Sequence, residues 1–203
     1  MITLPRLYPI ADAPFFSSSD LLLRFAEELA SAGCTLLQYR NKSGNTRLMA
    51  EQGKLLRARL CDLKLIMNDR PDLAVLCEFN GVHVGQDDLP PEPTHRVVGN
   101  EFWLGVSTHN PEQVIEADKS PADYIAIGPV YTTSSKARPD PVIGLEGVRR
   151  ARALTRKPLV AIGGITRANC RVVIEAGADS VAVISDLVTE PRKSAEDFFR
   201  ILG

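Results

Sequence analysis

The sequence lacks a long apolar run and any strong charge of one sign. No apolar run approaches the ~20 residues of a membrane span. The first residues, Met1 to Asp12, lack the apolar core of a secretory signal. We therefore expect a cytoplasmic protein with no membrane association. The net charge is −1, from 24 basic and 25 acidic side chains, which gives no sign of a general attraction to nucleic acid.

The cysteines have neither the spacing of a metal site nor that of a redox pair. None forms a C-x-x-C pair, and none lies near a histidine at zinc-ligand spacing. Each lies in an apolar or helical stretch, so we expect reduced thiols packed in the core. They are Cys34, Cys61, Cys77 and Cys170.

Common catalytic and nucleotide-binding signatures are also missing. There is no G-x-S-x-G and no Ser-His-Asp arrangement, and no G-x-G-x-x-G or Walker loop follows the first predicted strand. Of the histidines, His83 is expected to be hydrogen-bonded in the interior, His109 to lie near a pocket, and His95 to be solvated. Three aromatic residues are expected to serve packing: Phe102, Trp103 and Tyr124.

Short apolar runs alternate with amphipathic segments along the whole chain. Several runs, such as Tyr124-Ile125-Ala126-Ile127, are almost continuously apolar, which is typical of parallel strands buried on both faces. Eight strands are predicted: Arg6–Ala11, Thr35–Arg40, Lys64–Asn68, Gly81–Val84, Trp103–Ser107, Tyr124–Gly128, Pro158–Ile162 and Ser180–Ile184.

Helix signals lie between the predicted strands. Ser18 and Ser19 precede an amphipathic run that stops at Gly33, and Asn110 precedes a proline at a first helical position. Further helices are predicted from Thr166 to about Gly177, over 144–155 and over 190–202, whereas 88–100, with three prolines, is expected to be a loop or a poor helix.

Eight βα units in 203 residues predict an α/β protein with a single (β/α)₈ TIM barrel over residues 1–203. An open doubly wound sheet is the alternative. In such a barrel the active site lies at the carboxyl ends of the strands, and nearly every predicted strand ends in polar residues.

Gln38, Arg40 and Lys42 follow one another at alternate positions at the end of the second strand. Alternate residues face the same side of a strand, so all three can point to the barrel mouth. Two cations and an amide suit a polyanion. Ordinary solvated charge is the alternative.

Asp69 and Asp88 end the third and fourth strands, which are neighbours in the barrel. Two carboxylates beside a diphosphate site are a usual arrangement for Mg²⁺. Helix capping by Asp69 is the alternative, and Asp87 could replace Asp88.

The loop Thr132–Lys136 carries four hydroxyl groups and ends in a cation, which suits a phosphate group. Gly163-Gly164 and Ile184-Ser185 follow the seventh and eighth strands, where many barrels bind phosphate through backbone N–H groups. A flexible surface loop and a plain glycine turn are the alternatives.

Taken together, the strand-end motifs resemble those of the thiamine-phosphate synthase family, in the same order, from about residue 6 to residue 188. The matching segments are Gln38-Tyr39-Arg40-Asn41-Lys42, Asn68-Asp69-Arg70, 81–89 with its Gly-Gln-Asp-Asp, Gly105-Val106-Ser107, 123–130, Ala161-Ile162-Gly163-Gly164-Ile165 and 177–185.

The resemblance implies a (β/α)₈ enzyme, a transferase, that joins 4-amino-2-methyl-5-hydroxymethylpyrimidine diphosphate to 4-methyl-5-(2-phosphoethyl)thiazole, or its carboxylated form, with Mg²⁺ as cofactor and release of diphosphate. It also implies the site residues. Those for the pyrimidine diphosphate are Gln38, Arg40, Lys42, Asn68, Ser107 and Lys136, of which Arg40, Lys42 and Lys136 would stabilise the leaving group. Those for Mg²⁺ are Asp69 and Asp88, and those for the thiazole phosphate are Thr133, Ser135, Gly164, Ile184 and Ser185.

The chain departs from the family pattern at two positions. Thr132 stands where the family usually has proline, and Asn41 where it often has an acidic residue. There are two alternative functions. One is a thiazole tautomerase of the sister family, with His109 as acid/base group, and the other is a non-catalytic module that binds thiamine precursors. The sequence leaves the oligomeric state open, with a homodimer as one option.

Overall fold

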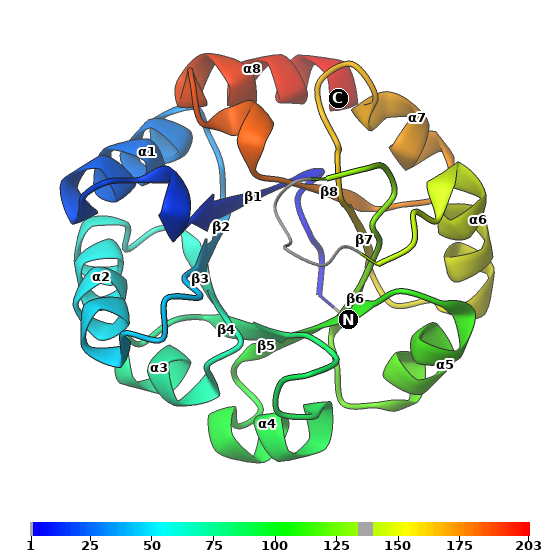
Figure 1. Cartoon of the computed structure of the whole chain (residues 1–203), viewed down its shortest axis with the longest axis horizontal. Coiled ribbons are helices and arrows are strands. Elements are labelled where there is room, and N and C mark those ends of the chain that lie inside the picture. Colours follow the sequence, from blue (N-terminus) through cyan, green and yellow to red (C-terminus); the bar gives the residue numbers. More distant parts are fainter. Residues whose placement is uncertain (1, 134–139) are drawn as a thin grey trace.

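The computed structural model describes residues 2–133 and 140–203, which form a closed barrel of eight parallel strands (Figure 1). Each strand pairs with the next in the sequence, and β8 pairs with β1 through Leu7 opposite Val181. The predicted TIM barrel is therefore confirmed. The strands are β1 (Leu7–Asp12), β2 (Leu36–Arg40), β3 (Lys64–Asn68), β4 (Gly81–Val84), β5 (Trp103–Thr108), β6 (Tyr124–Ile127), β7 (Leu159–Ile162) and β8 (Ser180–Val183).

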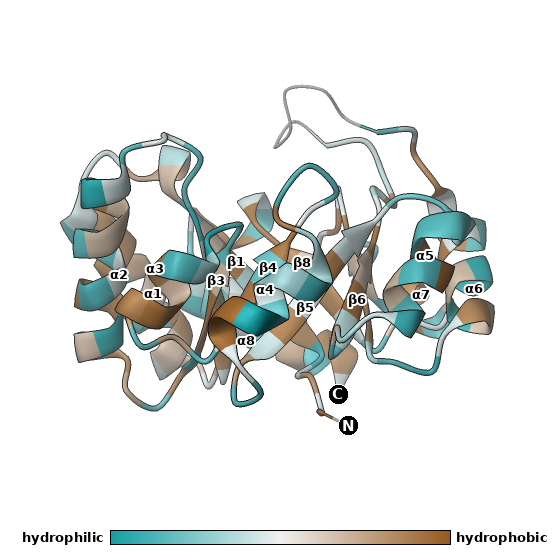
Figure 2. Ribbon diagram, turned by 90° about the horizontal axis from the view of Figure 1, so that it is seen from below, coloured by the Kyte–Doolittle hydropathy of each residue, from teal (hydrophilic) through white to brown (hydrophobic). Residues whose placement is uncertain are grey.

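The helices form a ring outside the strands (Figure 1). The α-helices are α1 (Ser19–Ser31), α2 (Thr46–Arg59), α3 (Pro71–Leu76), α4 (Pro91–Val98), α5 (Pro111–Lys119), α6 (Gly144–Leu154), α7 (Cys170–Glu175) and α8 (Pro191–Leu202). Two short 3-10 helices are η1 (Ala13–Phe15) and η2 (Ser185–Leu187). In Figure 2 both chain ends lie at the lower rim, so the loops that follow the strands form the opposite rim.

The helix signals of the sequence act as predicted. The Ser18 side chain accepts a hydrogen bond from the backbone N–H of Leu21 at the start of α1. Asn110 caps α5 in the same way through Gln113, and Pro111 occupies its first turn. A side-chain acceptor at this position satisfies a backbone donor that has no partner within the helix.

Two helix predictions were wrong in detail. The proline-rich stretch 88–100 contains α4, an eight-residue α-helix. Its prolines, Pro90, Pro91 and Pro93, lie at the cap or in the first turn, where backbone N–H groups have no helical acceptor to lose. The helix expected from Thr166 begins only at Cys170, because Thr166 donates its N–H to the Asn169 side chain in a turn.

Two apolar cores lie on the two sides of the strand cylinder. The larger core fills the space between strands and helices and includes Phe25, Leu65 and Phe198. The smaller core fills the lower barrel interior and includes Ile66 and Val160. Three cysteines are buried as expected, but Cys61 is exposed, because it lies in the turn after α2 rather than in the core.

No helix within the described part of the chain has both the length and the apolar character needed to cross a bilayer.

Candidate functional site

A pocket of about 460 Å³ opens at the carboxyl ends of the strands. All the predicted site residues that the structure describes line it: Gln38, Arg40, Lys42, Asn68, Asp69, Asp88, Ser107, Thr133, Gly164, Ile184 and Ser185. The remaining two, Ser135 and Lys136, lie outside the described residues. Residues scattered over 148 positions of the sequence, from 38 to 185, therefore meet at one place.

The three polar residues of the second strand line the pocket as predicted. Gln38 is only 3% exposed. Arg40 donates from one Nη atom to both carboxylate oxygens of Asp12, at 2.7 and 2.8 Å. Lys42 is half exposed and lies 2.7 Å from Asp69. Gln38 and Arg40 are thus held in place, which is not how ordinary solvated charge at a strand end behaves.

Asp12 was missed in the sequence. It ends β1 opposite Arg40 and is buried. A buried carboxylate against a guanidinium fixes the direction of the arginine fork, so Asp12 orients Arg40 toward the pocket.

Asp69 and Asp88 lie close enough for their carboxyl groups to interact. Burial, together with the neighbouring Asp88 carboxyl, raises the pKa of Asp69 to about 6, although the Lys42 ammonium acts in the opposite direction. The ionised form of Asp69 is therefore disfavoured in the absence of further positive charge. Asp69 also adopts a left-handed backbone conformation, with φ 64°, a region that costs free energy for residues other than glycine.

The structure does not support the capping role for Asp69. Arg70 is the N-cap of α3, and no side chain caps that helix. Asp88 accepts a hydrogen bond from the Gly85 N–H at 2.8 Å, which fixes one of its oxygens beside the pocket. Asp87 lines the pocket as well, but Asp88 is the carboxylate that interacts with Asp69.

The two carboxylates fit Mg²⁺. Both offer hard oxygen donors, and a divalent cation between them would relieve the repulsion that raises the pKa of Asp69. No group of three or more His, Cys, Asp or Glu side chains is placed to hold a metal in the described part of the chain. Water and substrate phosphate oxygens would complete the octahedron, as is usual for Mg²⁺.

Asn68 carries an unpaired donor at the pocket. Its side chain is 7% exposed, and its Nδ2 atom has no hydrogen-bond partner within the described residues. A buried polar atom without a partner costs free energy. A ligand with acceptor oxygens in the pocket would supply the missing partner.

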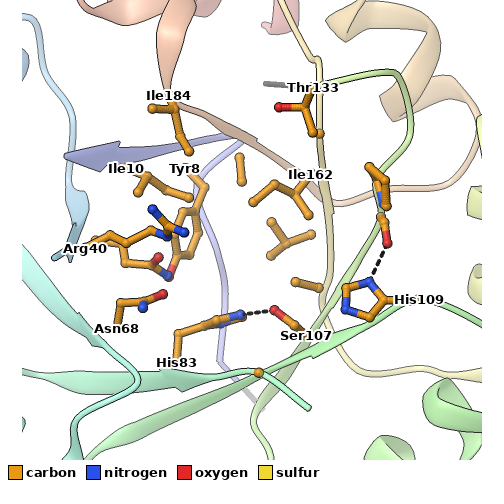
Figure 3. A pocket seen from close by; sticks show the side chains of 18 of the residues that line it. Tyr8, Ile10, Arg40, Asn68, His83, Ser107, His109, Thr133, Ile162 and Ile184 are labelled. Atoms are coloured by element: carbon orange, nitrogen blue, oxygen red, sulfur yellow. Dashed lines mark hydrogen bonds between the residues drawn. The ribbon is translucent and has the colours of Figure 1, made fainter. Parts of the chain in front are cut away.

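A chain of buried polar side chains crosses the floor of the pocket. Gln38 donates to the Tyr8 hydroxyl at 3.0 Å, and the Tyr8 and Tyr124 hydroxyls lie 2.7 Å apart. His83 contacts the Tyr124 hydroxyl through Nδ1 at 3.2 Å. Its Nε2 atom lies 2.8 Å from Ser107 Oγ (Figure 3). Burial lowers the pKa of His83 to about 4 and raises the pKa of Tyr8 and Tyr124. The interior, hydrogen-bonded His83 is confirmed, whereas the packing role assigned to Tyr124 is incomplete and Tyr8 was missed.

The opposite side of the pocket is formed by the ends of β6, β7 and β8. Figure 3 shows Thr133 and Ile184 across the pocket from Asn68 and His83. Gly164 has φ 63°, and a Cβ there would crowd the Thr132 carbonyl oxygen. Only glycine fits this turn without strain, because the loop after β6 packs directly against it.

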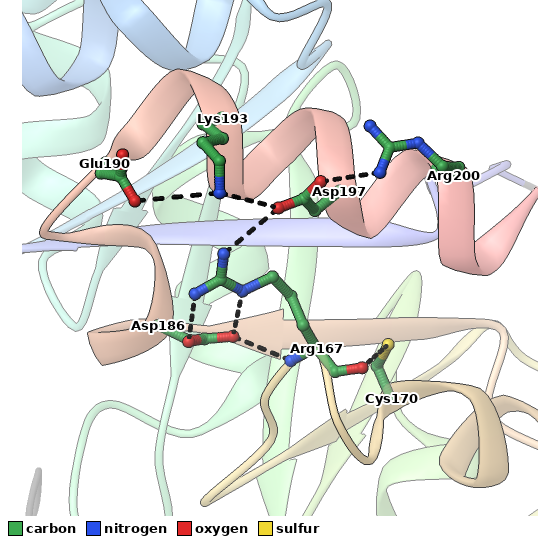
Figure 4. Close-up of polar contacts among 7 residues, drawn as sticks. All are labelled: Arg167, Cys170, Asp186, Glu190, Lys193, Asp197 and Arg200. Carbon is green, nitrogen blue, oxygen red and sulfur yellow. Dashed lines mark hydrogen bonds and ion pairs between the residues drawn. The ribbon is translucent and has the colours of Figure 1, made fainter.

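Arg167 ties the loop after β7 to the loop after β8 (Figure 4). Its guanidinium lies 3.1 Å from Asp186 and 3.3 Å from Asp197, and its backbone N–H donates to Asp186 at 2.8 Å. Asp186 follows Ser185 in η2, so these contacts hold the turn that contains Ser185, a residue predicted to bind phosphate.

His109 lies at the pocket, as expected. Its Nδ1 atom lies 2.7 Å from the Gly128 carbonyl oxygen, and its Nε2 atom lies 3.5 Å from Asp140. A carbonyl oxygen can only accept, so Nδ1 carries a proton.

Comparison with known proteins identifies relatives over the full barrel. The profile of the family described as "Thiamine monophosphate synthase" matches residues 7–187. The thiamine-phosphate synthase of Koribacter versatilis is 56% identical over 99% of this chain and 97% of its own length. That of Chloroflexus aurantiacus is 42% identical over 90% of this chain and 85% of its own length.

A solved structure agrees with these relatives. The thiamine phosphate pyrophosphorylase of Pyrococcus furiosus superposes with a TM-score of 0.84 at 35% identity, covering 97% of this chain and 95% of its own. A second structure, 3-hexulose-6-phosphate synthase, has a TM-score of 0.72 at 14% identity over 97% of this chain and 100% of its own, a likeness of fold alone.

Proposed function

The chain belongs to the thiamine monophosphate synthase family and is a transferase that makes thiamine phosphate, and from this premise we propose how its pocket binds the two substrates. The substrates are an aminopyrimidine diphosphate and a thiazole phosphate, free or carboxylated. The observation that carries the proposal is one pocket in which Arg40 and Asn68 lie across from Thr133 and Ile184 (Figure 3). We assign an anionic group of one substrate to each of these two sides.

On one side, the diphosphate of the pyrimidine substrate is bound by residues of β2 and β3. Arg40, oriented by Asp12, and Lys42 supply positive charge, and Asn68 donates its unpaired N–H. Arginine and lysine groups fixed around a departing anion stabilise the charge that develops on it. Lys136, predicted from the sequence to act beside them, belongs to the same proposal.

Asp69 and Asp88 would hold Mg²⁺ next to this diphosphate. When bound, the metal would act as a Lewis acid that neutralises charge on the diphosphate oxygens. Lys42 already contacts Asp69 at 2.7 Å, so the lysine links the proposed metal site to the anion site.

On the other side, the thiazole phosphate is bound by the loops after β6, β7 and β8. Gly164 and Ser185 line this side of the pocket, and Ser185 is the first residue of the short helix η2, whose first backbone N–H groups have no acceptor within the helix and could donate to the phosphate. Thr133 lines the same side (Figure 3), and Ser135 is predicted from the sequence to join it.

The reaction needs positioning rather than a protein nucleophile. The bond between the pyrimidine methylene carbon and the diphosphate oxygen breaks, and its electron pair leaves with the diphosphate. The thiazole nitrogen lone pair then forms the new bond to that carbon. The barrel holds the two substrates in line, which converts a meeting of two molecules into a reaction within one complex.

The test is a two-substrate assay on the purified protein. We expect thiamine phosphate to form with both substrates and Mg²⁺, and not with EDTA. No product from folded protein under either condition would refute the proposal. The sister-family alternative, a tautomerase using His109, predicts a metal-independent proton shift on the thiazole alone, which the same samples can report.

Three further expectations from the sequence stay predictions. They are that residues 1–203 form one domain, that the protein is cytoplasmic, and that a homodimer is one option for its oligomeric state. Size-exclusion chromatography with light scattering would decide the last of these.

A further inference from the structure

We propose that Tyr8, Tyr124 and His83 form a directed hydrogen-bond relay that fixes the Ser107 hydroxyl as a donor to the pyrimidine substrate. The three side chains are positioning residues, because they affect the substrate only through Ser107. Gln38 is the donor at the other end of the relay. The inference rests on the proposed function in one respect, that the ligand beside Ser107 is the aminopyrimidine.

The relay spans the pocket floor from β2 to β5. Its links measure 3.0 Å from Gln38 to Tyr8, 2.7 Å from Tyr8 to Tyr124, 3.2 Å from Tyr124 to His83 and 2.8 Å from His83 to Ser107. Gln38, Tyr8, Tyr124 and His83 are all at least nine-tenths buried. Water therefore does not compete for these hydrogen bonds, and each donor must find its acceptor within the chain.

The direction of the relay follows from the donor at its first link. Gln38 Nε2 can only donate, so the Tyr8 oxygen accepts from it. The Tyr8 proton then goes to the Tyr124 oxygen, and the Tyr124 proton goes to His83 Nδ1. This order gives every hydroxyl proton in the relay an acceptor within it.

His83 transmits the direction to Ser107. A neutral imidazole that accepts at Nδ1 carries its proton at Nε2, and this proton is donated to Ser107 Oγ. An imidazole that accepts at Nδ1 and donates at Nε2 is the neutral ring, so the order of the hydrogen bonds from Gln38 to His83 sets both the charge and the tautomer. Ser107 is only partly buried and lines the pocket, so its own hydroxyl proton is directed to a ligand acceptor, such as a ring nitrogen.

A glycine on β5, the strand that carries Ser107, leaves the space in which Tyr124 and His83 meet. Gly105 faces the barrel interior two residues before Ser107, and a Cβ there would overlap both the Tyr124 ring and His83 Nδ1. Its φ is not in the left-handed region, so space alone requires glycine at this position. The link between Tyr124 on β6 and His83 on β4 therefore depends on the absence of a side chain at this position of β5.

The first test removes single hydroxyl groups. Tyr124→Phe and Tyr8→Phe keep the rings and break the relay, so the Ser107 proton loses its fixed direction. We expect KM for the pyrimidine diphosphate to rise about tenfold, the size of one neutral hydrogen bond, with KM for the thiazole phosphate unchanged. Tyr39→Phe is the matched control, because Tyr39 is buried on the same sheet but bonds outward to Gln52 and Asn41.

A double-mutant cycle decides whether the tyrosines act through Ser107. In the Ser107→Ala background, Tyr124→Phe should have no further effect on KM for the pyrimidine substrate. A full tenfold effect in that background, or none in the native background, overturns the relay.

The tautomer of His83 can be measured by NMR in the absence of substrate. In ¹⁵N-histidine-labelled wild-type protein, the NMR spectrum should show His83 protonated at Nε2 and unprotonated at Nδ1, with assignment by His83→Gln. The opposite tautomer overturns the inference, even if Tyr124→Phe fails to fold. An inactive wild-type protein with the expected tautomer would refute the proposed function but not the direction of the relay.

Discussion

Asp69 has two features that lower the stability of the folded protein and that suit a metal-binding site. Its buried carboxyl group faces Asp88, and its backbone is left-handed. Each feature costs stability. The ion pair with Lys42 does not offset the cost of burying the charge, since the pKa of Asp69 is still raised to about 6. A group kept at such a cost is typical of a binding site.

We predict that Asp69→Asn stabilises the metal-free protein and weakens Mg²⁺ binding. The amide carries no charge, so the repulsion with Asp88 is lost, and asparagine tolerates a left-handed backbone. Tm in EDTA should rise, the Mg²⁺ concentration for half-maximal activity should increase about tenfold or more, and the rise of Tm on adding Mg²⁺ should shrink. Asp87→Asn is the control. An unchanged Mg²⁺ response in Asp69→Asn would remove this carboxylate from the metal site.

The pH dependence of the wild-type protein follows from the same carboxyl group. Its folded pKa lies above its ordinary value, so the folded state binds more protons than the unfolded state between about pH 4 and pH 6. The contribution of Asp69 to stability is present at pH 4 and is lost as the pH rises through 6. Mg²⁺ binds the ionised form, so Mg²⁺ should raise Tm more at pH 7.5 than at pH 5, and equal shifts would contradict this assignment.

Sequence reasoning found the polar residues at the ends of most strands, but it missed Asp12 at the end of β1 and Tyr8 inside the same strand. Gln38, Arg40 and Asp88 interrupt or end apolar runs, so their polarity marks them. Tyr8 lies within the run from Leu7 to Ala11, where both faces of the strand are buried. In such a run, the two-residue period does not tell which side chains face the barrel interior.

At the level of elements, Arg167 connects the loops after β7 and β8, which line the proposed thiazole-phosphate side of the pocket. Arg167 joins them through Asp186 and reaches Asp197 on α8, which also contacts Lys193 and Arg200 (Figure 4). The contacts are partly exposed, so they contribute little to global stability. Their effect is on the position of η2 and hence of Ser185.

We predict that Arg167→Met raises KM for the thiazole phosphate several-fold, up to about tenfold, and leaves KM for the pyrimidine diphosphate unchanged. Loss of these hydrogen bonds and ion pairs, worth about 1 kcal/mol, lets η2 shift. Arg192→Met is the matched control, because Arg192 pairs only with Glu196 on the exposed face of α8 among the described residues. Equal changes in both KM values would show a general loosening of the barrel instead.

The boundaries of elements were predictable where local chemistry alone sets them. The strand ends agree within one or two residues because apolar runs are bounded by polar residues. The start of α7 depends on a turn in which the Asn169 side chain accepts from the Thr166 N–H, and hydrophobic periodicity does not report such a turn. Ser135 and Lys136 lie outside the described residues, so their roles stay predictions from the sequence.

At the scale of the molecule, the barrel is closed by contacts between the first and last units. β8 pairs with β1, and α8 packs on α1, α7 and β1. The alternation of strands and helices predicted a barrel, but an open sheet fits the same alternation. Closure depends on pairing between residues about 174 positions apart, such as Leu7 and Val181, which periodicity does not report.

We predict that Phe198→Ala lowers the free energy of unfolding by about 3–5 kcal/mol. Phe198 is fully buried on α8, within the core that joins the helices to the strands, and the vacated space cannot collapse without moving α8 from β1. Tm should fall by roughly 10 °C, while kcat at low temperature stays near the native value, since Phe198 does not line the pocket. Val172→Ala, at a 41% exposed position of α7, should change stability by no more than about 0.5 kcal/mol. If Phe198→Ala instead lost activity at temperatures where circular dichroism shows it folded, closure of the helix ring would be part of the site itself.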